Sequence, residues 1–152
     1  MRRYAGVIVL ILITLTAQSV LIVRRANPGF VPLMDDAYYY FQIGRNIAEG
    51  RGATFDGEHP TNGYHPLWMG FVVLSYRLFP GDPTAPIIFL QYIGLLFFLG
   101  TLLILAHILF RITNRPWLVT TLLALYLINP FVIHFPSDGL ETALAVFLFA
   151  AF

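Results

Sequence analysis

Six side chains in the polar parts of this chain can accept protons or bind cations, although the sequence is otherwise rich in apolar residues. They are Asp35, Asp36, Glu58, His59, His65 and Glu141. Two adjacent carboxylates such as Asp35 and Asp36 can act as a general base toward a hydroxyl or an amine, or hold a divalent cation. Because this pair stands at the expected start of a helix, the helix dipole favours its ionised form. The simpler alternative is that one aspartate caps the helix and the other is only solvated, and the spacing alone leaves both interpretations open.

Glu141 is a further carboxylate of interest, because it stands beside the expected start of an apolar helix. A charge in such a place is costly unless it caps the helix or binds a partner. Together with Asp138 and Gly139, Glu141 can cap that helix, and it can equally serve a site. The sequence leaves both interpretations open.

The tyrosines and histidines of the first polar segment also have two interpretations. Tyr38, Tyr39 and Tyr40 suit the headgroup level of a membrane, where aromatic rings with a polar tip prefer to lie, and such rings also stack on sugars. His59 and His65 are separated by five residues, a spacing that matches no established metal motif. We therefore predict no metal ligands among the site residues.

The composition indicates which elements must position these residues. Of the 152 residues, 58% are hydrophobic and 11% are charged, whereas a soluble domain carries about 25% charged residues. The net charge of +1 provides no basic surface, so we exclude nucleic acid as a partner. The lack of cysteine excludes disulfides and thiolate chemistry.

Four apolar stretches predict membrane-spanning helices, at about residues 5–23, 87–110, 117–135 and 140–152. The first is roughly 28 Å long at 1.5 Å per residue, about one hydrocarbon core. A cleaved signal peptide is its alternative, but the apolar run continues past Ala17 and Ser19, which favours an uncleaved helix. The third stretch is expected to bend at Pro130. Since the fourth is too short to cross a bilayer, we expect residues 1–152 to be the N-terminal part of a longer transmembrane module.

The polar segment 24–86 predicts two helices that lie against the membrane rather than crossing it. Residues 35–49 form a helix that Gly50 and Gly52 end, with polar side chains at steps of three and four residues. Residues 66–79 are apolar but too few to span a bilayer. The predicted fold class is therefore an all-α polytopic transmembrane helix bundle with juxtamembrane helices in its first external loop.

The charge distribution predicts which side of the membrane each polar segment faces. With the N-terminus and the link at 111–116 inside, the loop at 24–86 and the break at 136–142 lie outside. All eight acidic residues then face outward, and the inside segments carry only arginine, as the positive-inside tendency favours. Arg24 and Arg25 oppose this arrangement. If residues 66–79 span the bilayer instead, Asp35 and Glu141 lie on opposite faces.

Three segments in order resemble the GT-C glycosyltransferases, which include protein O-mannosyltransferases and lipid A aminoarabinose transferases. The string DDAYYY at 35–40, followed by FQIGRNIAEG, resembles the acidic pair and juxtamembrane helix that open the first external loop of that family. The string HPTNGYHPLW at 59–68 resembles its later loop motif, where Pro-Leu and an aromatic residue open a second helix. The string DGLET at 138–142 resembles the acidic motif of its second external loop.

The resemblance implies a polyprenyl-phosphate-linked sugar as donor and assigns roles to individual residues. Asp35 is the expected base that deprotonates or polarises the acceptor, Asp36 assists it, and Glu141 matches the second-loop carboxylate. The acceptor attacks the anomeric carbon as the lipid phosphate leaves, with inversion at that carbon. The leaving phosphate needs a nearby cation, which can be Arg45, Arg51, Arg77 or an arginine outside these 152 residues. The expected substrate-binding residues are Tyr39, Arg45, His59, Asn62, His65 and Asp138.

The expected function is thus sugar transfer to an acceptor of open identity at the external face of the cell membrane. No cofactor is assigned, and a divalent metal stays open because the related oligosaccharyltransferases require one while mannosyltransferases generally do not. Family members have eight or more spans, so we expect the 152-residue chain alone to be inactive. The alternative function is a non-catalytic multi-pass membrane protein, such as a transporter or an assembly subunit.

Overall fold

The computed structural model of the chain describes residues 2–25 and 33–152. Within these ranges the α-helices are α1 (Ala5–Arg25), α2 (Asp35–Ala48), α3 (Pro66–Leu78), α4 (Ala85–Thr113), α5 (Pro116–Leu127) and α6 (Thr142–Ala151), and the short 3-10 helices are η1 (Arg2–Tyr4) and η2 (Val132–Ser137). The same ranges contain no β-strand, so the prediction of an all-α fold is confirmed.

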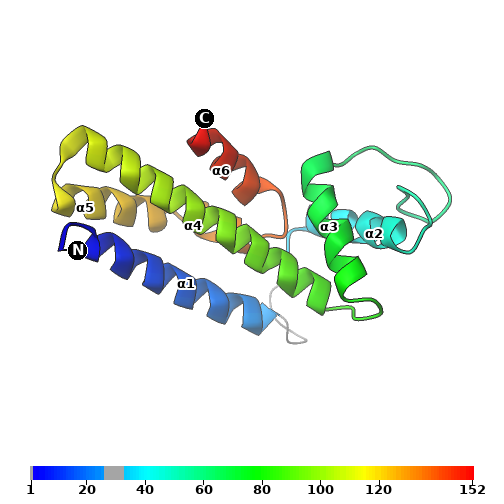
Figure 1. Cartoon of the computed structure of the whole chain (residues 1–152). Coiled ribbons are helices and arrows are strands. Elements are labelled where there is room, and N and C mark those ends of the chain that lie inside the picture. The colour runs from blue at the N-terminus through cyan, green and yellow to red at the C-terminus, as the bar shows by residue number, and fades with distance from the viewer. Residues whose placement is uncertain (1, 26–32) are drawn as a thin grey trace.

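The long helix α4 forms the axis of the molecule, and α1, α5 and α6 lie along it (Figure 1). α1 runs antiparallel to α4: Arg3, just before α1, donates an Nη2–H bond to the carbonyl oxygen of Phe110, near the end of α4, at 3.1 Å. The Tyr4 ring meets the Phe110 ring edge-on, with 4.9 Å between centroids. Buried side chains such as Phe98 and Val119 fill the space between α1, α4 and α5.

Two of the described helices, α1 and α4, are long and apolar enough to cross a membrane. They confirm the helices predicted at 5–23 and 87–110, and both extend slightly beyond the predicted ends. α4 carries Pro86 in its first turn, where a missing N–H does no harm. Its end at Asn114 adopts a left-handed conformation, with φ of 49°, which stops the helix.

The prediction of one helix over 117–135 that bends at Pro130 is wrong. α5 ends at Leu127, and η2 begins only at Val132 after an irregular stretch. Pro130 has no N–H to donate and disfavours helical geometry at the residue before it, and the Oδ1 atom of Asn129 accepts the N–H of Phe131 at 2.9 Å. The 12 residues of α5 extend roughly 18 Å, which is less than a hydrocarbon core. α6 is likewise a short apolar helix, and it begins at Thr142 rather than at 140.

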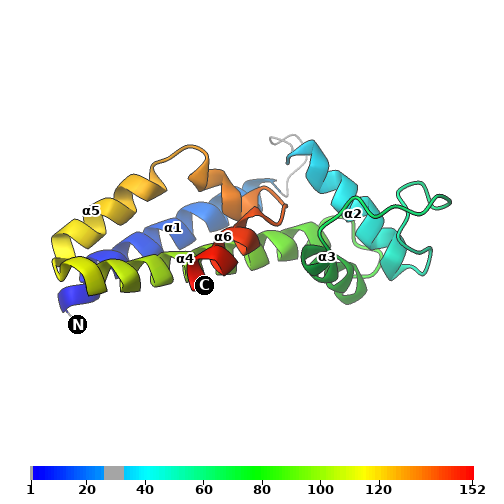
Figure 2. The same ribbon diagram turned by 90° about the horizontal axis from the view of Figure 1, so that it is seen from above.

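α2 and α3 confirm the two helices predicted in segment 24–86, and they pack together beside the first turns of α4 (Figure 2). Gly44 allows this close packing, because a Cβ at that position would overlap the side chain of Val72. Ile43, Trp68 and Leu90 are buried in this second core. Leu144 of α6 belongs to the same core, so the chain returns to α2 and α3 after α5 and η2.

Candidate functional site

The turn before α6 packs against the starts of α2 and α3, and this contact forms the candidate site. Gly139, with φ of +84°, lies so close to α2 that an added Cβ would be 2.9 Å from the Phe41 ring and 3.0 Å from the Cβ of Ala37. The buried indole N–H of Trp68, in the first turn of α3, donates to the carbonyl oxygen of Gly139 at 3.2 Å. Three segments that are far apart in sequence therefore meet here.

The side chains of these segments form a hydrogen-bonded group, the Tyr40–His65–Glu141 cluster. Nδ1 of His65 lies 2.8 Å from Oε1 of Glu141 and 2.7 Å from the hydroxyl oxygen of Tyr40. The backbone N–H of His65 also donates to that hydroxyl oxygen, at 3.0 Å. The phenol and imidazole rings are nearly parallel, with an interplanar angle of 6°. One residue each from α2, the start of α3 and the turn before α6 is thus held in one place.

Glu141 does not act as a helix cap, which was one of its two sequence interpretations. It occupies the N-cap position of α6, but its side chain makes no capping hydrogen bond. Its carboxylate turns to His65 instead, and its Oε2 atom is buried without a donor among the described residues. Asp138 shapes the turn, because its Oδ1 atom accepts the N–H of Leu140 at 2.8 Å. This arrangement favours a role for Glu141 in a site.

The hydroxyl of Tyr40 keeps its proton at neutral pH. Burial raises the pKa of Tyr40, and the negative charges of Glu141 and Asp36 raise it further, against the backbone hydrogen bond from His65 that lowers it. Asp36 and Tyr40 are four residues apart and lie on one face of α2. The charges of Asp36 and of Glu141 therefore act on the same phenol.

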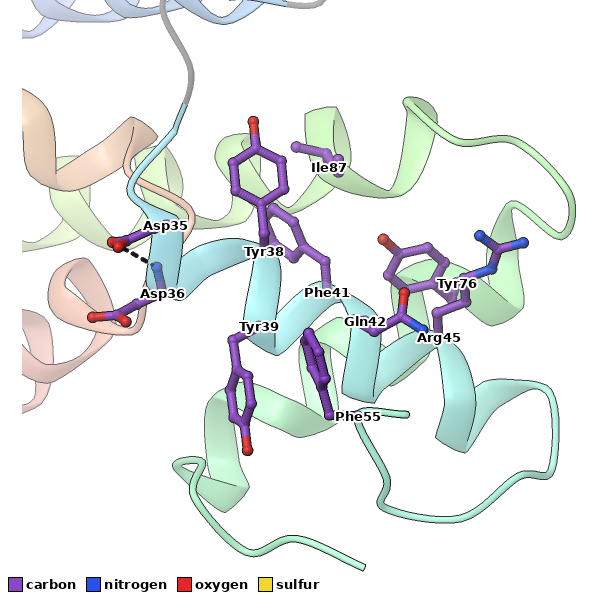
Figure 3. A pocket seen from close by; sticks show the side chains of 10 residues that line it. All are labelled: Asp35, Asp36, Tyr38, Tyr39, Phe41, Gln42, Arg45, Phe55, Tyr76 and Ile87. Atoms are coloured by element: carbon purple, nitrogen blue, oxygen red, sulfur yellow. Dashed lines mark hydrogen bonds between the residues drawn. The ribbon is translucent and has the colours of Figure 1, made fainter. Parts of the chain in front are cut away.

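The expectation that Asp35 or Asp36 caps α2 is corrected by the structure. α2 begins at Asp35 itself, and Met34 holds the N-cap position without a side-chain hydrogen bond. The Oδ1 atom of Asp35 accepts the N–H of Asp36 at 3.0 Å, and both residues are exposed. Figure 3 shows the two carboxylates side by side at the start of the helix. Among residues 2–25 and 33–152, three of their four carboxylate oxygens accept no hydrogen bond, and because both side chains are exposed, a solute can reach them.

A shallow groove of about 590 Å³ follows α2 from the acidic pair to Arg45 (Figure 3). Its lining combines carboxylates, aromatic rings and one cation: Asp35, Asp36, Tyr38, Tyr39, Phe41, Gln42, Arg45, Phe55, Tyr76 and Ile87. The rings of Tyr39 and Phe55 stack, with 5.0 Å between centroids, and the Tyr39 hydroxyl bonds to Thr61 at 2.8 Å. Arg45 donates its Nε–H to Glu49 at 2.8 Å, which leaves its other N–H groups for a ligand.

A buried polar side chain of α2, that of Asn46, holds the loop that follows this helix. Asn46 is 1% exposed, and its amide donates to the carbonyl oxygens of Thr54 at 2.8 Å and Phe55 at 3.2 Å. Its Oδ1 atom accepts from Nη2 of Arg51 at 2.7 Å. Asn46 therefore fixes Phe55, and with it the ring that stacks on Tyr39.

Three of the predicted substrate-binding residues belong to neither the cluster nor the groove: His59, Asn62 and Asp138, which shapes the turn before α6. His59 is exposed and pairs with Asp56, Nδ1 to Oδ2 at 2.7 Å, within a local turn. Hydrogen bonds from the backbone N–H groups of His59 and Glu58 and from the His59 ring hold the pKa of Asp56 well below its usual range. Asn62 is exposed further along the same loop. Among residues 2–25 and 33–152, no three histidine or carboxylate side chains gather in a way that would hold a metal ion.

Three residues of the site escaped the sequence interpretation: Tyr40, Trp68 and Gly139. Tyr40 was grouped with its neighbours as a membrane anchor or a ring that stacks on sugars, although its spacing of four residues from Asp36 indicates a shared helix face. Trp68 appeared only within a motif, and Gly139 only within a motif and a helix cap. Their contact with each other spans 71 residues of sequence, and no local pattern encodes it.

The fold and the site together define an all-helical protein with two long apolar helices and a polar, acid-rich site beside the start of one of them. No protein-family model, curated protein or solved structure matches the chain. The resemblance to GT-C glycosyltransferases therefore depends on the three sequence motifs alone.

Proposed function

We propose that this chain belongs to a membrane glycosyltransferase that moves a sugar from a polyprenyl-phosphate donor to an acceptor at the outer membrane face. One observation carries the proposal. The turn that bears Glu141 packs onto α2 and α3, so that its carboxylate meets His65 beside the phenol of Tyr40, and the charge of Asp36 on α2 acts on the same phenol. All three motifs of the resemblance meet at that place.

The placement in a membrane is supported by the surface of α1. Ile8, Val9 and Leu12 are each more than half exposed on this helix. Exposed side chains of this kind are unfavourable in water and natural against lipid tails. We propose that α1 and α4 cross the bilayer and that α5 and α6 lie within it beside them.

The orientation is supported by the separation of charge along α4. Arg3, Arg111 and Arg115 lie where α1 begins and α4 ends. All eight acidic residues lie in or beside α2, α3, the start of α4 and the turn before α6. Since cytoplasmic segments carry an excess of arginine and lysine, the acidic end faces outward, although Arg24, Arg45, Arg51 and Arg77 lie at that end too.

The groove along α2 matches what the transfer reaction requires. The carboxylates of Asp35 and Asp36 accept hydrogen bonds from the acceptor's hydroxyl or amine and polarise it, which makes its lone pair a better nucleophile. The stacked rings of Tyr39 and Phe55 offer an apolar face to a sugar ring. Arg45, at the far end of the groove, carries the positive charge that stabilises the departing lipid phosphate.

The proposal is tested with membranes from the cells that make this protein, compared with membranes from the same cells after deletion of its gene. Both are given a panel of polyprenyl phosphates that carry labelled mannose, glucose or aminoarabinose. We expect gene-dependent transfer of label from one donor, with release of polyprenyl phosphate. Equal labelling with and without the gene, across the panel, would instead favour a non-catalytic membrane protein.

A further inference from the structure

The imidazole of His65 has one nitrogen inside the cluster and one outside it. Nδ1 faces the carboxylate of Glu141 at 2.8 Å, whereas the side chain of His65 as a whole is 70% exposed and that of Glu141 is 25% exposed. The carboxylate is therefore on the protein side of the ring. Nε2, on the opposite edge of the imidazole, is left for a solute.

The contacts of Nδ1 favour one of the two tautomers of His65. An ionised carboxylate offers only lone pairs, so a lone pair on Nδ1 at this distance from Glu141 would be repelled. The hydroxyl oxygen of Tyr40 accepts the backbone N–H of His65 and lies 2.7 Å from Nδ1, where it accepts or donates according to the tautomer. Because a hydrogen on Nδ1 serves both the carboxylate and this hydroxyl, we assign it to Nδ1, which leaves the lone pair of the neutral ring on Nε2.

A histidine held in this way is built to accept a proton. In catalytic sites, a carboxylate bonded to Nδ1–H keeps the imidazole in the correct tautomer and stabilises the imidazolium that forms when Nε2 takes up a proton. Glu141, in the turn before α6, faces His65 with a carboxylate oxygen 2.8 Å from Nδ1. Its negative charge stabilises a positive charge on the ring.

We infer that His65 is the base that receives the proton of the acceptor, and that Glu141 positions it. This inference rests on the proposed function and gives Asp35 and Asp36 the task of binding and polarising the acceptor. The acceptor's O–H or N–H bond breaks, and its proton goes to Nε2 of His65. The electron pair that remains on the acceptor forms the new bond to the anomeric carbon. The bond from that carbon to the phosphate oxygen breaks, and its pair leaves with the polyprenyl phosphate.

The first test substitutes His65 in the cellular protein and uses the membrane assay with the labelled donor. Asparagine places an N–H where Nδ1 was but offers no Nε2, so H65N is expected to lower transfer by about 100-fold or more. The same substitution at His107, which is exposed on α4 away from the cluster, is expected to leave transfer unchanged. Added imidazole is expected to restore part of the activity of H65A and none of the activity lost in D35N. Transfer by H65N at the wild-type rate would overturn the inference.

The second test measures directly which ring nitrogen of His65 carries hydrogen, and it does not depend on transfer activity. Nitrogen-15 NMR of the ¹⁵N-histidine-labelled chain in lipid nanodiscs is expected to show His65 with hydrogen on Nδ1 and a lone pair on Nε2. E141Q is expected to shift His65 toward the Nε2–H tautomer, while H107N leaves the His65 signals in place. A wild-type His65 with hydrogen on Nε2 alone would overturn the positioning by Glu141. If wild-type membranes transfer no label, the proposed function fails, while the NMR result still decides the state of His65.

Discussion

Replacement of both Asp35 and Asp36 by asparagine is expected to lower sugar transfer by about 1000-fold. Asparagine keeps the size of each side chain, and neither carboxylate caps α2, so the helix should still form. What is lost is the pair of charges that polarises the acceptor beside the Tyr40–His65–Glu141 cluster. The measurement is the initial rate of label transfer in membranes that contain equal amounts of each protein.

The matched control for this pair is Glu58→Gln, which also converts an acid to its amide. Glu58 is exposed in the loop after α2 and lines neither the groove nor the cluster. Its replacement should leave the rate within about twofold of wild type. Wild-type turnover by the double asparagine variant, with correct folding, would remove the acidic pair from the mechanism.

Gly139→Ala is expected to lower the free energy of unfolding by about 2–4 kcal/mol and to abolish transfer. An alanine there must adopt a φ of +84°, and its Cβ would press on Phe41 at 2.9 Å and on Ala37 at 3.0 Å. The turn must then move away from α2. That movement breaks the hydrogen bond from Trp68 and separates Glu141 from His65. Thermal unfolding in nanodiscs measures the loss of stability.

Gly70→Ala is the control for Gly139→Ala, because it replaces a glycine by alanine at a position without close neighbours. Gly70 lies in α3, and a Cβ at that position meets nothing within 4 Å. Alanine there is expected to raise stability slightly, by about 0.5–1 kcal/mol, because glycine is unfavourable inside a helix. If Gly139→Ala unfolds at the wild-type temperature, the turn is not held against α2.

The helices of this chain were largely predictable because their signals are local. Gly50, with φ of 82°, follows Glu49, the C-cap residue of α2, and Pro66 opens α3, as expected from their backbone preferences. The third predicted helix failed for a reason that is also local. The sequence predicted that Pro130 bends a helix. Instead the helix ends before Pro130, and the side chain of Asn129 accepts the backbone N–H of Phe131.

The candidate site was only partly predictable, because its contacts join distant parts of the chain. Asp36, His65 and Glu141 were found by residue type, since carboxylates and histidines are conspicuous in an apolar sequence. Their association depends on the close approach of Gly139 to α2 and on the indole bond of Trp68. Neither the hydrophobic periodicity of the sequence nor the spacing of its residues indicates contacts between such distant segments.

The most direct test of the shared site is cross-linking between positions 65 and 141 in intact cells. The chain has no cysteine, so the double variant His65→Cys/Glu141→Cys carries the only thiols. We predict that a short, membrane-impermeant bismaleimide joins them within one chain. The pair His65→Cys/Arg111→Cys should not react in this way, because α4 separates those positions by most of its 29 residues, roughly 40 Å. Labelling of the two introduced thiols from opposite sides of the membrane, or no cross-link although both are labelled, would contradict the meeting of the three segments.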